Sequence, residues 1–437
     1  MKIPALFAAA LLASPVCAAG EFESLLADSR VESALRLLRD DDARTLAEQI
    51  AITQIPAPPF KESVRAQDFA ARLREIGLRD VSIDAAGNVI AKRPGTAKGK
   101  GPLLVLSAHL DTVFDEGTDL TVKQEDGRYH APGISDDARG LAALLTLARA
   151  MQTANLRTVG DVWFVGTVGE EALGNLRGVK ALFSDNPRID GFISVDGVDA
   201  PRHEGRSEIV NQATGSRRWE ISFTGPGGHS FENFGNPSAV HAMGRAIARI
   251  AALEVAEDPR TTFNVGVASG GTGVTSIAAA ATMRVDIRSN DAAELAKLEE
   301  RILAAVDESV RAENARVDSA LTTSKVTSER KLIGDRPASA RSTDTTLVDA
   351  AVGAYLALDL PKPLLRAAST DSNVPLGLGI PAATMNGGGR GDMAHSHDEW
   401  YEHVNAWQGP QVLLLTTLRL AGLQGVSKPA LAVRKRR

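Results

Sequence analysis

Cysteine is almost missing from this sequence, which has only Cys17, and aromatic residues are few. A single thiol near the N-terminus excludes a disulfide scaffold, a CxxC zinc site and a cysteine nucleophile from the body of the chain. Phe, Trp and Tyr together make up 4% of the 437 residues. That composition suits a loop-rich α/β enzyme better than an all-β binding module.

An excess of basic charge is also missing. Lys and Arg number 49 and Asp and Glu 54, so the formal net charge is −5. Nucleic acids and anionic membranes attract strongly basic surfaces, so we expect neither as a partner. Hydrophobic residues at 43% and charged residues at 24% are the shares of a folded globular chain. They exclude a disordered or fibrous protein.

The N-terminus has the pattern of a targeting segment. Lys2 precedes a short apolar run over residues 3–12, and small residues follow at 18–19, which is typical of a secretory signal. The run is too short to cross a bilayer, which needs about 20 apolar residues. We therefore expect residues 1–19 to be a signal peptide and the mature protein to be periplasmic or secreted. A lipid anchor on Cys17 is the alternative, although Val16 is bulkier than such signals prefer.

Apolar periodicity predicts an α/β fold over the first half of the chain. Residues 21–80 have helical spacing, interrupted by three prolines within 56–59. Apolar runs of strand length follow at 103–108, 162–168 and 191–195, with a helical pattern between the first two. This alternation predicts a mixed, mostly parallel sheet with helices on both faces.

The order of elements changes after residue 213. Residues 214–327 read as β-α-β-β-α-β, with the last strand at 315–321, and this is the order of a ferredoxin-like α+β domain. We therefore predict an inserted lid or dimerisation domain at 214–327 in a catalytic domain made of 20–213 and 328–425. The basic end, 426–437, is expected to be a frayed, solvated tail.

Histidine and acidic residues cluster where these elements end or begin. They are His109 and Asp111, Asp136 and Asp137, Glu170 and Glu171, Asp196, and His395, His397 and Glu399 in a late loop. The carboxyl ends of parallel strands meet at one edge of a sheet, so these clusters can converge there. Neighbouring carboxylates repel each other, and a multivalent cation removes that cost. Imidazoles and carboxylates without thiols suit zinc, cobalt or manganese.

The clusters resemble the motifs of the co-catalytic dizinc metallopeptidase family that includes peptidase T, the glutamate carboxypeptidase and the aminoacylase/desuccinylase enzymes. Residues 107–113, SAHLDTV, resemble that family's GHxDTV, and residues 133–137, GISDD, resemble its GxxDD. Residues 169–171, GEE, resemble its DEE or GEE, and residues 394–399, AHSHDE, its late HxxxE. The resemblance runs from about residue 45 to 425 and implies a zinc-peptidase fold.

The resemblance also implies a site with two zinc ions, for which cobalt or manganese could substitute. The implied ligands are His109 and Asp196 for one ion, Glu171 and His395 for the other, and Asp136 for both. Glu170 is implied as the general base for a metal-bridging water, and Asp111 as the partner that fixes the His109 ring.

Two ligand positions have alternatives. His397 could replace His395, although only His395 stands four residues before Glu399 as in the family motif. Asp137 could replace Asp136, although the first Asp of the pair is the family position. The resemblance also implies that the peptide bond between these two residues is cis.

The inserted domain carries further family motifs. Residues 225–230, GPGGHS, resemble a segment whose histidine reaches the active site of the partner subunit, which implies a homodimer with His229 binding the oxyanion. As a residue after a glycine-rich turn, His229 could instead belong only to the turn. Residues 270–277 resemble GGTxxNxIP, but Thr275 stands where the family has Asn. Arg288 completes the motif DxR and either holds a substrate carboxylate or braces the domain.

We therefore predict an exported dimetal peptidase that cleaves small peptides with a free N-terminus. In the family, Asp at the position of Asp196 is typical of aminopeptidases and dipeptidases, and Glu is typical of carboxypeptidases and deacylases. Asp371 could hold the substrate ammonium, or only cap a turn. The alternatives are an N-acyl amino acid deacylase or carboxypeptidase, and an inactive peptide-binding relative, which the presence of Glu170 disfavours. A serine hydrolase is disfavoured because the sequence has no GxSxG elbow.

Overall fold

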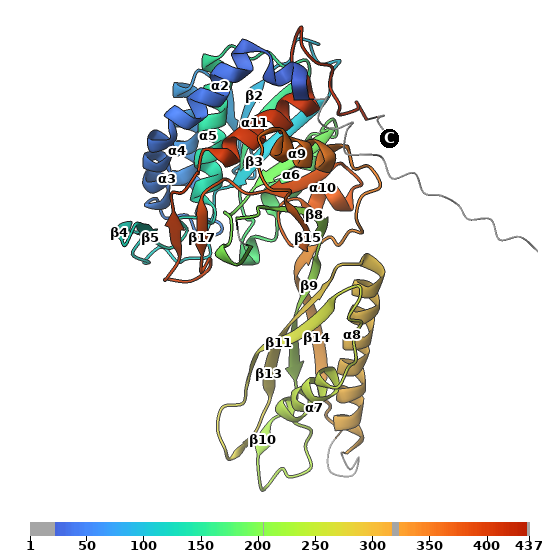
Figure 1. Ribbon diagram of the computed structural model, residues 1–437. Coiled ribbons are helices and arrows are strands. Elements are labelled where there is room, and N and C mark those ends of the chain that lie inside the picture. Colours follow the sequence, from blue (N-terminus) through green and yellow to red (C-terminus); the bar gives the residue numbers. More distant parts are fainter. Residues whose placement is uncertain (1–21, 204, 317–322, 435–437) are drawn as a thin grey trace, which may run out of the picture.

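The computed structural model describes residues 22–203, 205–316 and 323–434, which form a large lobe and an elongated lid (Figure 1). The large lobe is built on an eight-stranded sheet with the order β1-β2-β6-β3-β7-β16-β8-β15. Its strands are β1 (Asp80–Ile83), β2 (Val89–Arg93), β6 (Asp161–Thr167), β3 (Leu103–His109), β7 (Gly191–Val195), β16 (Ala382–Met385), β8 (Glu208–Ala213) and β15 (Leu364–Ala368). The central strands β6, β3, β7 and β16 run parallel, which confirms the predicted mixed, mostly parallel sheet.

Helices cover both faces of this sheet, because alternate residues of its buried strands face opposite ways. Leu104 and Leu106 of β3 belong to one apolar core, and Leu103 and Val105 belong to the other. The first core contains residues of α2 (Ser29–Asp40), α3 (Asp42–Thr53), α4 (Ser63–Glu75), α5 (Ala138–Thr153), α9 (Thr346–Ala357) and α11 (Gln408–Ala421). The second contains residues of α6 (Arg177–Asp185) and α10 (Asn373–Gly377). The predicted break at the prolines is confirmed, since it lies between α3 and α4.

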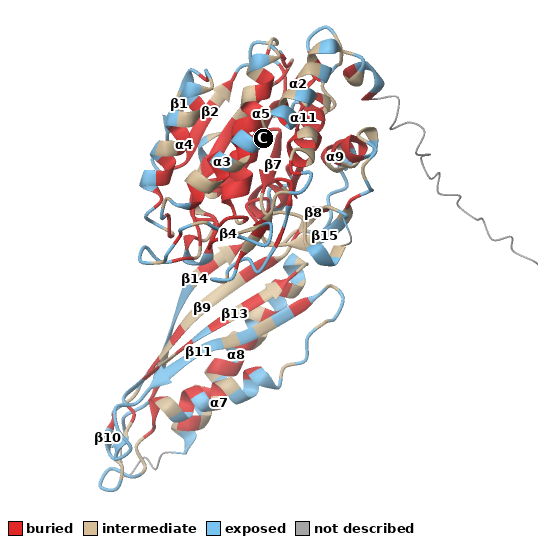
Figure 2. Cartoon of the chain, turned by 60° about the vertical axis from the view of Figure 1, so that its left-hand side comes forward, coloured by how far each residue is buried: buried red, intermediate tan, exposed pale blue. Residues whose placement is uncertain are grey.

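The lid is a four-stranded antiparallel sheet with two helices on one face (Figure 1). Its elements are β9 (Gly215–Thr224), α7 (Ala239–Ala251), β11 (Thr261–Gly270), β13 (Ala280–Ser289), α8 (Ala292–Ala315) and β14 (Thr327–Arg336). The order β11-β13-β9-β14 confirms the ferredoxin-like insertion. Figure 2 shows that the most continuous buried region lies in the large lobe, whereas β11 is largely exposed.

The lid ends later in the chain than we predicted. Ala315 is the last residue of α8, and 317–322, which make up most of the strand predicted at 315–321, lie outside the described residues. The strand that completes the lid sheet is β14, which pairs with β9 as far as Arg336. The boundary predicted at 327 is therefore wrong. Half of the residues of β14 are exposed at the sheet edge, and no apolar alternation marks it as a strand.

The C-terminal segment is not a solvated tail as far as the structure describes it. Leu431 is buried against Gly191, and its N–H donates to the carbonyl oxygen of Leu420. The N–H of Arg434 donates to Asp190 Oδ1 at 2.7 Å. The predicted frayed tail is therefore wrong up to residue 434, because an apolar side chain and a buried carboxylate hold it on the large lobe.

The predicted signal peptide, residues 1–19, lies outside the described residues. Within the part of the chain that the structure covers, no helix is long and apolar enough to cross a membrane.

Candidate metal centre

The site lies at the carboxyl edge of three parallel strands. His109 is the last residue of β3, all of whose residues are buried. Glu170 and Glu171 follow β6, and Asp196 follows β7, on either side of β3. Since the three strands are parallel, their following residues meet at one edge, as the sequence predicted.

Asp136 lies between two histidines and offers a different oxygen to each. Asp136 Oδ1 is 2.9 Å from His109 Nε2, and Asp136 Oδ2 is 3.1 Å from His395 Nε2. Asp196 Oδ1 is 4.0 Å from the same nitrogen of His109, and Glu171 Oε1 is 2.9 Å from that of His395. The structure thus brings all five implied ligands together in two groups that share Asp136. Within each group the donor atoms lie within 4.8 Å of one another.

This donor set fits two divalent cations. A carboxylate whose two oxygens face different histidines has the arrangement that a bridging ligand requires. Nitrogen and oxygen donors without sulfur suit zinc, cobalt or manganese. His109 Nδ1 lies 2.9 Å from the backbone carbonyl oxygen of Asp111, to which it can only donate, so its Nε2 is left free for a cation.

The protonation of the site shows how strongly it favours positive charge. Burial and the charge of Asp136 raise the pKa of Glu171 to about 8 and that of Asp196 to about 7. Hydrogen bonds to Asp136 and Glu171 raise the pKa of His395 to about 11. Burial opposes ionisation of Asp136, but hydrogen bonds from the two histidines hold its pKa below the usual value. Without a metal, protons bound to these residues therefore offset the negative charge of the carboxylates. A bound cation would take over that role.

The two alternative ligands, Asp137 and His397, make other contacts. Asp137 Oδ1 accepts the N–H of Gly140 at the start of α5, and its Oδ2 accepts the N–H of His109. The His397 ring packs 5.6 Å from that of Phe114. Among the described residues, the groups able to hold a metal include Asp136 and His395 and neither alternative. The peptide bond between the two aspartates is cis, as the resemblance implies.

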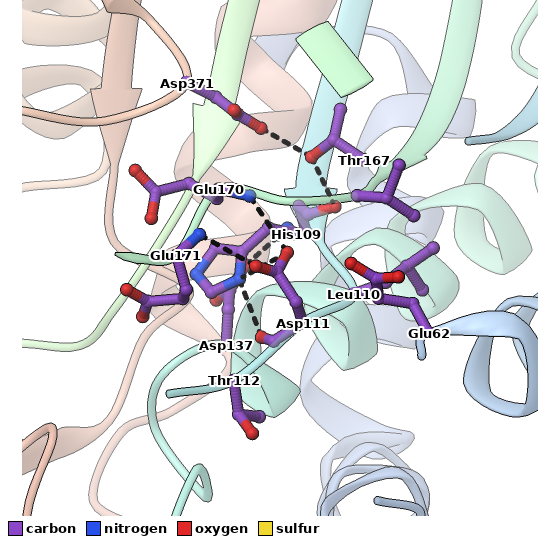
Figure 3. Close-up of polar contacts among 12 residues, drawn as sticks. Glu62, His109, Leu110, Asp111, Thr112, Asp137, Thr167, Glu170, Glu171 and Asp371 are labelled. Carbon is purple, nitrogen blue, oxygen red and sulfur yellow. Dashed lines mark hydrogen bonds and ion pairs between the residues drawn. The ribbon is translucent and has the colours of Figure 1, made fainter. Parts of the chain in front are cut away.

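Asp111 contacts a different partner from the one expected. Its carboxylate Oδ1 is 3.8 Å from His109 Nδ1, beyond hydrogen-bond distance, and the backbone carbonyl of Asp111 makes that contact instead. The carboxylate accepts the N–H groups of Glu170 at 3.0 Å and Glu171 at 2.7 Å (Figure 3). Asp111 therefore holds the loop after β6, because two backbone donors occupy the carboxylate.

Two supporting residues were not predicted. Glu399 is fully buried and accepts the N–H groups of Gly133, Ser135 and Asp136, so it shapes the loop that carries the shared ligand. Its place in the late motif was the only signal. Arg336 Nη1 lies 2.9 Å from Glu170 Oε1, and nothing in the local sequence marks it.

Asp371 belongs to the buried support of the site. It is 1% exposed, and its Oδ2 accepts the hydroxyl of Thr167 on β6 (Figure 3). Burial, with the charge of Glu170, raises the pKa of Asp371 to about 7. A carboxylate enclosed in this way does not face a substrate ammonium, so the suggested contact is not observed.

His229 and Arg288, the two lid residues predicted to take part in the site, lie at opposite ends of the lid. His229, on the short strand β10 (Gly228–His229), is exposed at the end of the lid farthest from the large lobe (Figure 1). The structure does not bring it to the ligand groups of its own chain. Arg288 Nε is 2.7 Å from Asp286 Oδ2, and Arg288 shares a rung of the sheet with Ser216 and Arg336. Arg288 therefore lies where the start of β9 and the end of β14 join the lid to the large lobe, which we call the hinge end of the lid.

A cavity of about 330 Å³ opens beside Asp136 and Asp196. Val198, Val210 and Met393 contribute apolar wall, and Arg366 is among the charged residues that line it. A space of this size beside the shared ligand Asp136 suits a small substrate.

Comparisons with known proteins agree with this geometry. Residues 105–418 match the family model of peptidase family M20/M25/M40. The chain is 25% identical over 225 residues to carboxypeptidase G2 of Pseudomonas sp., covering 50% of this chain and 52% of that protein. It is 27% identical over 196 residues to peptidase T of Photobacterium profundum, covering 43% and 47%. The matched segments thus span about half the length of these curated relatives.

Solved structures resemble this fold over nearly their whole length. The aminopeptidase PepT from Bacillus cereus superimposes with a TM-score of 0.68 at 20% identity, over 86% of this chain and 97% of that one. A tripeptidase from Staphylococcus aureus gives a TM-score of 0.65 at 21% identity, over 86% and 97%. At these identities the likeness concerns the fold alone.

Proposed function

The chain belongs to peptidase family M20/M25/M40 and is therefore an amide-bond hydrolase, and on that premise we propose that it is an exported dimetal peptidase acting on small peptides with a free N-terminus. One observation carries the proposal, namely that each oxygen of Asp136 faces a different histidine while Glu170 lies beside them. Export rests on the signal pattern of residues 1–19.

Each residue of the site has a separate role in the hydrolysis of the amide bond. His109 and Asp196 would hold one cation, Glu171 and His395 the other, and Asp136 would contact both. Two such cations, zinc above all, supply Lewis-acid polarisation of the amide carbonyl and make water more acidic. Glu170 takes the proton from the attacking water and returns it to the leaving amine. At 5% exposure its carboxylate is shielded from bulk water.

A free N-terminus is supported by Asp196, which stands where the family's aminopeptidases and dipeptidases have Asp. The cavity of about 330 Å³ beside it favours di- and tripeptides over longer chains. A homodimer is supported by the exposed edge strand β11 and by the position of His229, which only the site of a second copy could use.

A carboxypeptidase or N-acyl amino acid deacylase is the second candidate, and one observation favours it. Arg218, Arg288 and Arg336 lie at the hinge end of the lid, where Asp286 pairs with the first two and Glu170 with the third, so three guanidinium groups meet two carboxylates. Such an excess of guanidinium groups suits a substrate carboxylate, for which Arg288 is the candidate ligand.

Substrate panels separate the two candidates. The zinc-loaded protein is assayed with free di- and tripeptides, their N-acetylated and C-terminally amidated forms, N-acetyl amino acids and C-terminal glutamate conjugates. We expect free peptides to be cleaved, acetylation to abolish cleavage and amidation to matter little. Better turnover of N-acetyl amino acids or glutamate conjugates would establish the second candidate. Elemental analysis should find about two ions per chain, and a chelator should abolish activity.

The role of Glu170 is tested by Glu170→Gln. We expect turnover to fall by about 10²–10⁴-fold, since general-base catalysis contributes that much, while bound metal stays unchanged. Glu116→Gln, which removes an exposed partner of Lys61, is the control and should leave turnover unchanged. Near-normal rates in Glu170→Gln would refute the role.

A further inference from the structure

The loop 169–176, which carries Glu170 and Glu171, has an unusual backbone. Gly169, Ala172, Asn175 and Leu176 have positive φ angles, which non-glycine residues rarely adopt. In the three non-glycine residues this conformation is strained, so it persists only where surrounding contacts hold it.

Several of these contacts come from the lid. Arg336, at the end of β14, donates from Nη1 to Glu170 Oε1 at 2.9 Å and from Nη2 to the backbone oxygen of Glu170. Arg218 of β9 donates from Nη1 to the carbonyl of Ala172 at 2.7 Å. The N–H of Asp335 donates to Asn175 Oδ1 at 2.8 Å. Both strands join the lid to the large lobe, so the hinge contacts the loop at three points.

The surroundings of the Glu170 carboxylate favour a paired guanidinium such as that of Arg336. Glu170 is 5% exposed, and a second carboxylate lies close to it, since Asp111 Oδ1 accepts the N–H of Glu170 at 3.0 Å. The guanidinium of Arg336 is 4% exposed and also donates to Ser369 Oγ at 3.1 Å. A paired, hydrogen-bonded cation stabilises a buried carboxylate among like charges, and removing one partner of such a pair leaves the other charge uncompensated.

We propose that Arg336 is the positioning residue for the Glu170 carboxylate, and that its contact, with those of Arg218 and Asp335, couples the orientation of the lid to the catalytic loop. For the chemical role of Glu170 this inference rests on the proposed function. Because the hinge strands contact the loop directly, a movement of the lid moves the base relative to the ligand groups. Small displacements of a catalytic group reduce turnover steeply.

Kinetics of three variants test the positioning role. In Arg336→Met we expect kcat to fall about 10–100-fold, as for a misplaced catalytic group, with KM changed less than about threefold and metal content intact. Arg336→Lys should recover part of the loss, and added guanidinium ion should partly rescue Arg336→Met. Arg284→Gln, which breaks an arginine–glutamate pair with Glu220 elsewhere on the lid sheet, is the matched control. A rise in KM with unchanged kcat, or no effect at all, overturns the proposal.

Amide hydrogen exchange tests the coupling without any substrate. Asn175→Gly removes the acceptor for Asp335 while keeping the positive φ accessible. In this variant and in Arg336→Met, loop 169–176 should exchange at least about tenfold faster than in the wild type, and Arg284→Gln should leave it unchanged. Unchanged protection in both hinge variants overturns the coupling. Faster exchange in a protein that hydrolyses no substrate would instead uphold the coupling and reject the proposed function.

Discussion

Three buried carboxylates outside the implied ligand set accept hydrogen bonds from the backbone N–H groups of implied ligands. Asp137 accepts the N–H of His109, Asp111 accepts that of Glu171, and Glu399 accepts that of Asp136. Each bond fixes a ligand by its main chain and leaves its side chain free for a cation. Such supporting groups orient the ligands, and the loss of one typically lowers metal affinity or activity about 10–100-fold.

Replacing Glu399 by Gln tests this at one residue. The amide nitrogen cannot accept a hydrogen bond, so at least one N–H of the loop 133–136 loses its acceptor. We expect zinc affinity to fall about 10–100-fold, measured by competition with a chelator. Glu402→Gln is the control, because Glu402 forms an exposed pair with Arg390. Equal affinity in the two variants would show that Glu399 does not support the ligand loop.

Zinc affinity should also depend on pH. Without metal, burial first of all raises the pKa of Glu171 to about 8 and of Asp196 to about 7, and hydrogen bonds raise that of His395 to about 11. Protons bound below these values must leave when the cation binds, so affinity should rise from about pH 6 to about pH 8.

Each proton released should contribute about a tenfold gain in affinity per pH unit. Calorimetry in two buffers of different ionisation enthalpy counts the protons. Affinity that is flat or falls over this range would contradict the assigned ligands.

At the scale of elements, α5 links the site to the core. Nearly all of its residues are buried, and Asp137 caps its first turn through the N–H of Gly140. Arg139, in the same turn, donates to the carbonyl oxygens of Gly387 and Ala406 and so ties the helix to the late loops. The helix start therefore fixes both the shared ligand and the segments that lead to His395.

Asp137→Ala should destabilise the fold through this helix. The variant loses an N-cap and leaves the buried N–H of His109 without its acceptor, which together cost about 2–4 kcal/mol. Urea unfolding of the metal-free proteins measures the difference. Asp291→Ala, which removes the half-buried N-cap of α8, is the matched control and should cost about 1 kcal/mol. Equal losses would show that the bond to His109 contributes nothing.

At the scale of the molecule, the lid extends far from the large lobe and carries His229 at its distant end (Figure 1). Exposed side chains gather there, including Phe231, Phe234 and Val274. A second copy arranged about a twofold axis could place this end over the site of its partner. That arrangement would complete each site with a residue from the other chain.

Mixed dimers test this arrangement. His229→Ala and Glu170→Gln should each be nearly inactive, but a co-expressed mixture should regain about a quarter of the wild-type rate, because random pairing gives half mixed dimers with one intact site each. Sedimentation measures the oligomeric state, and metal content should be normal in both variants. A fully active monomer, or a mixture no better than its components, would contradict action in trans.

Much of the fold could be predicted from apolar periodicity, and the ligand set from short motifs that resemble those of a known family. Apolar periodicity located β3, β6 and β7, and the residues that follow parallel strands meet at one edge whatever the loops do. The order of the first five elements indicated the ferredoxin-like lid, although the last strand was predicted too early in the chain. The family resemblance pointed to His395 and Asp136 over their neighbours, and the structure brings the same residues to the ligand groups.

Only the tertiary structure decided which distant residues support the site. The contact of Arg336 with Glu170 joins residues 166 positions apart, and that of Glu399 with Asp136 joins residues 263 positions apart. No local sequence pattern indicates contacts between residues so far apart in the chain. The same reason explains the lid boundary at Arg336 and the packed C-terminal segment, since β14 lies exposed at a sheet edge and Leu431 is buried by strands far back in the chain. Local patterns determine which elements form, whereas packing between elements determines which side chains meet.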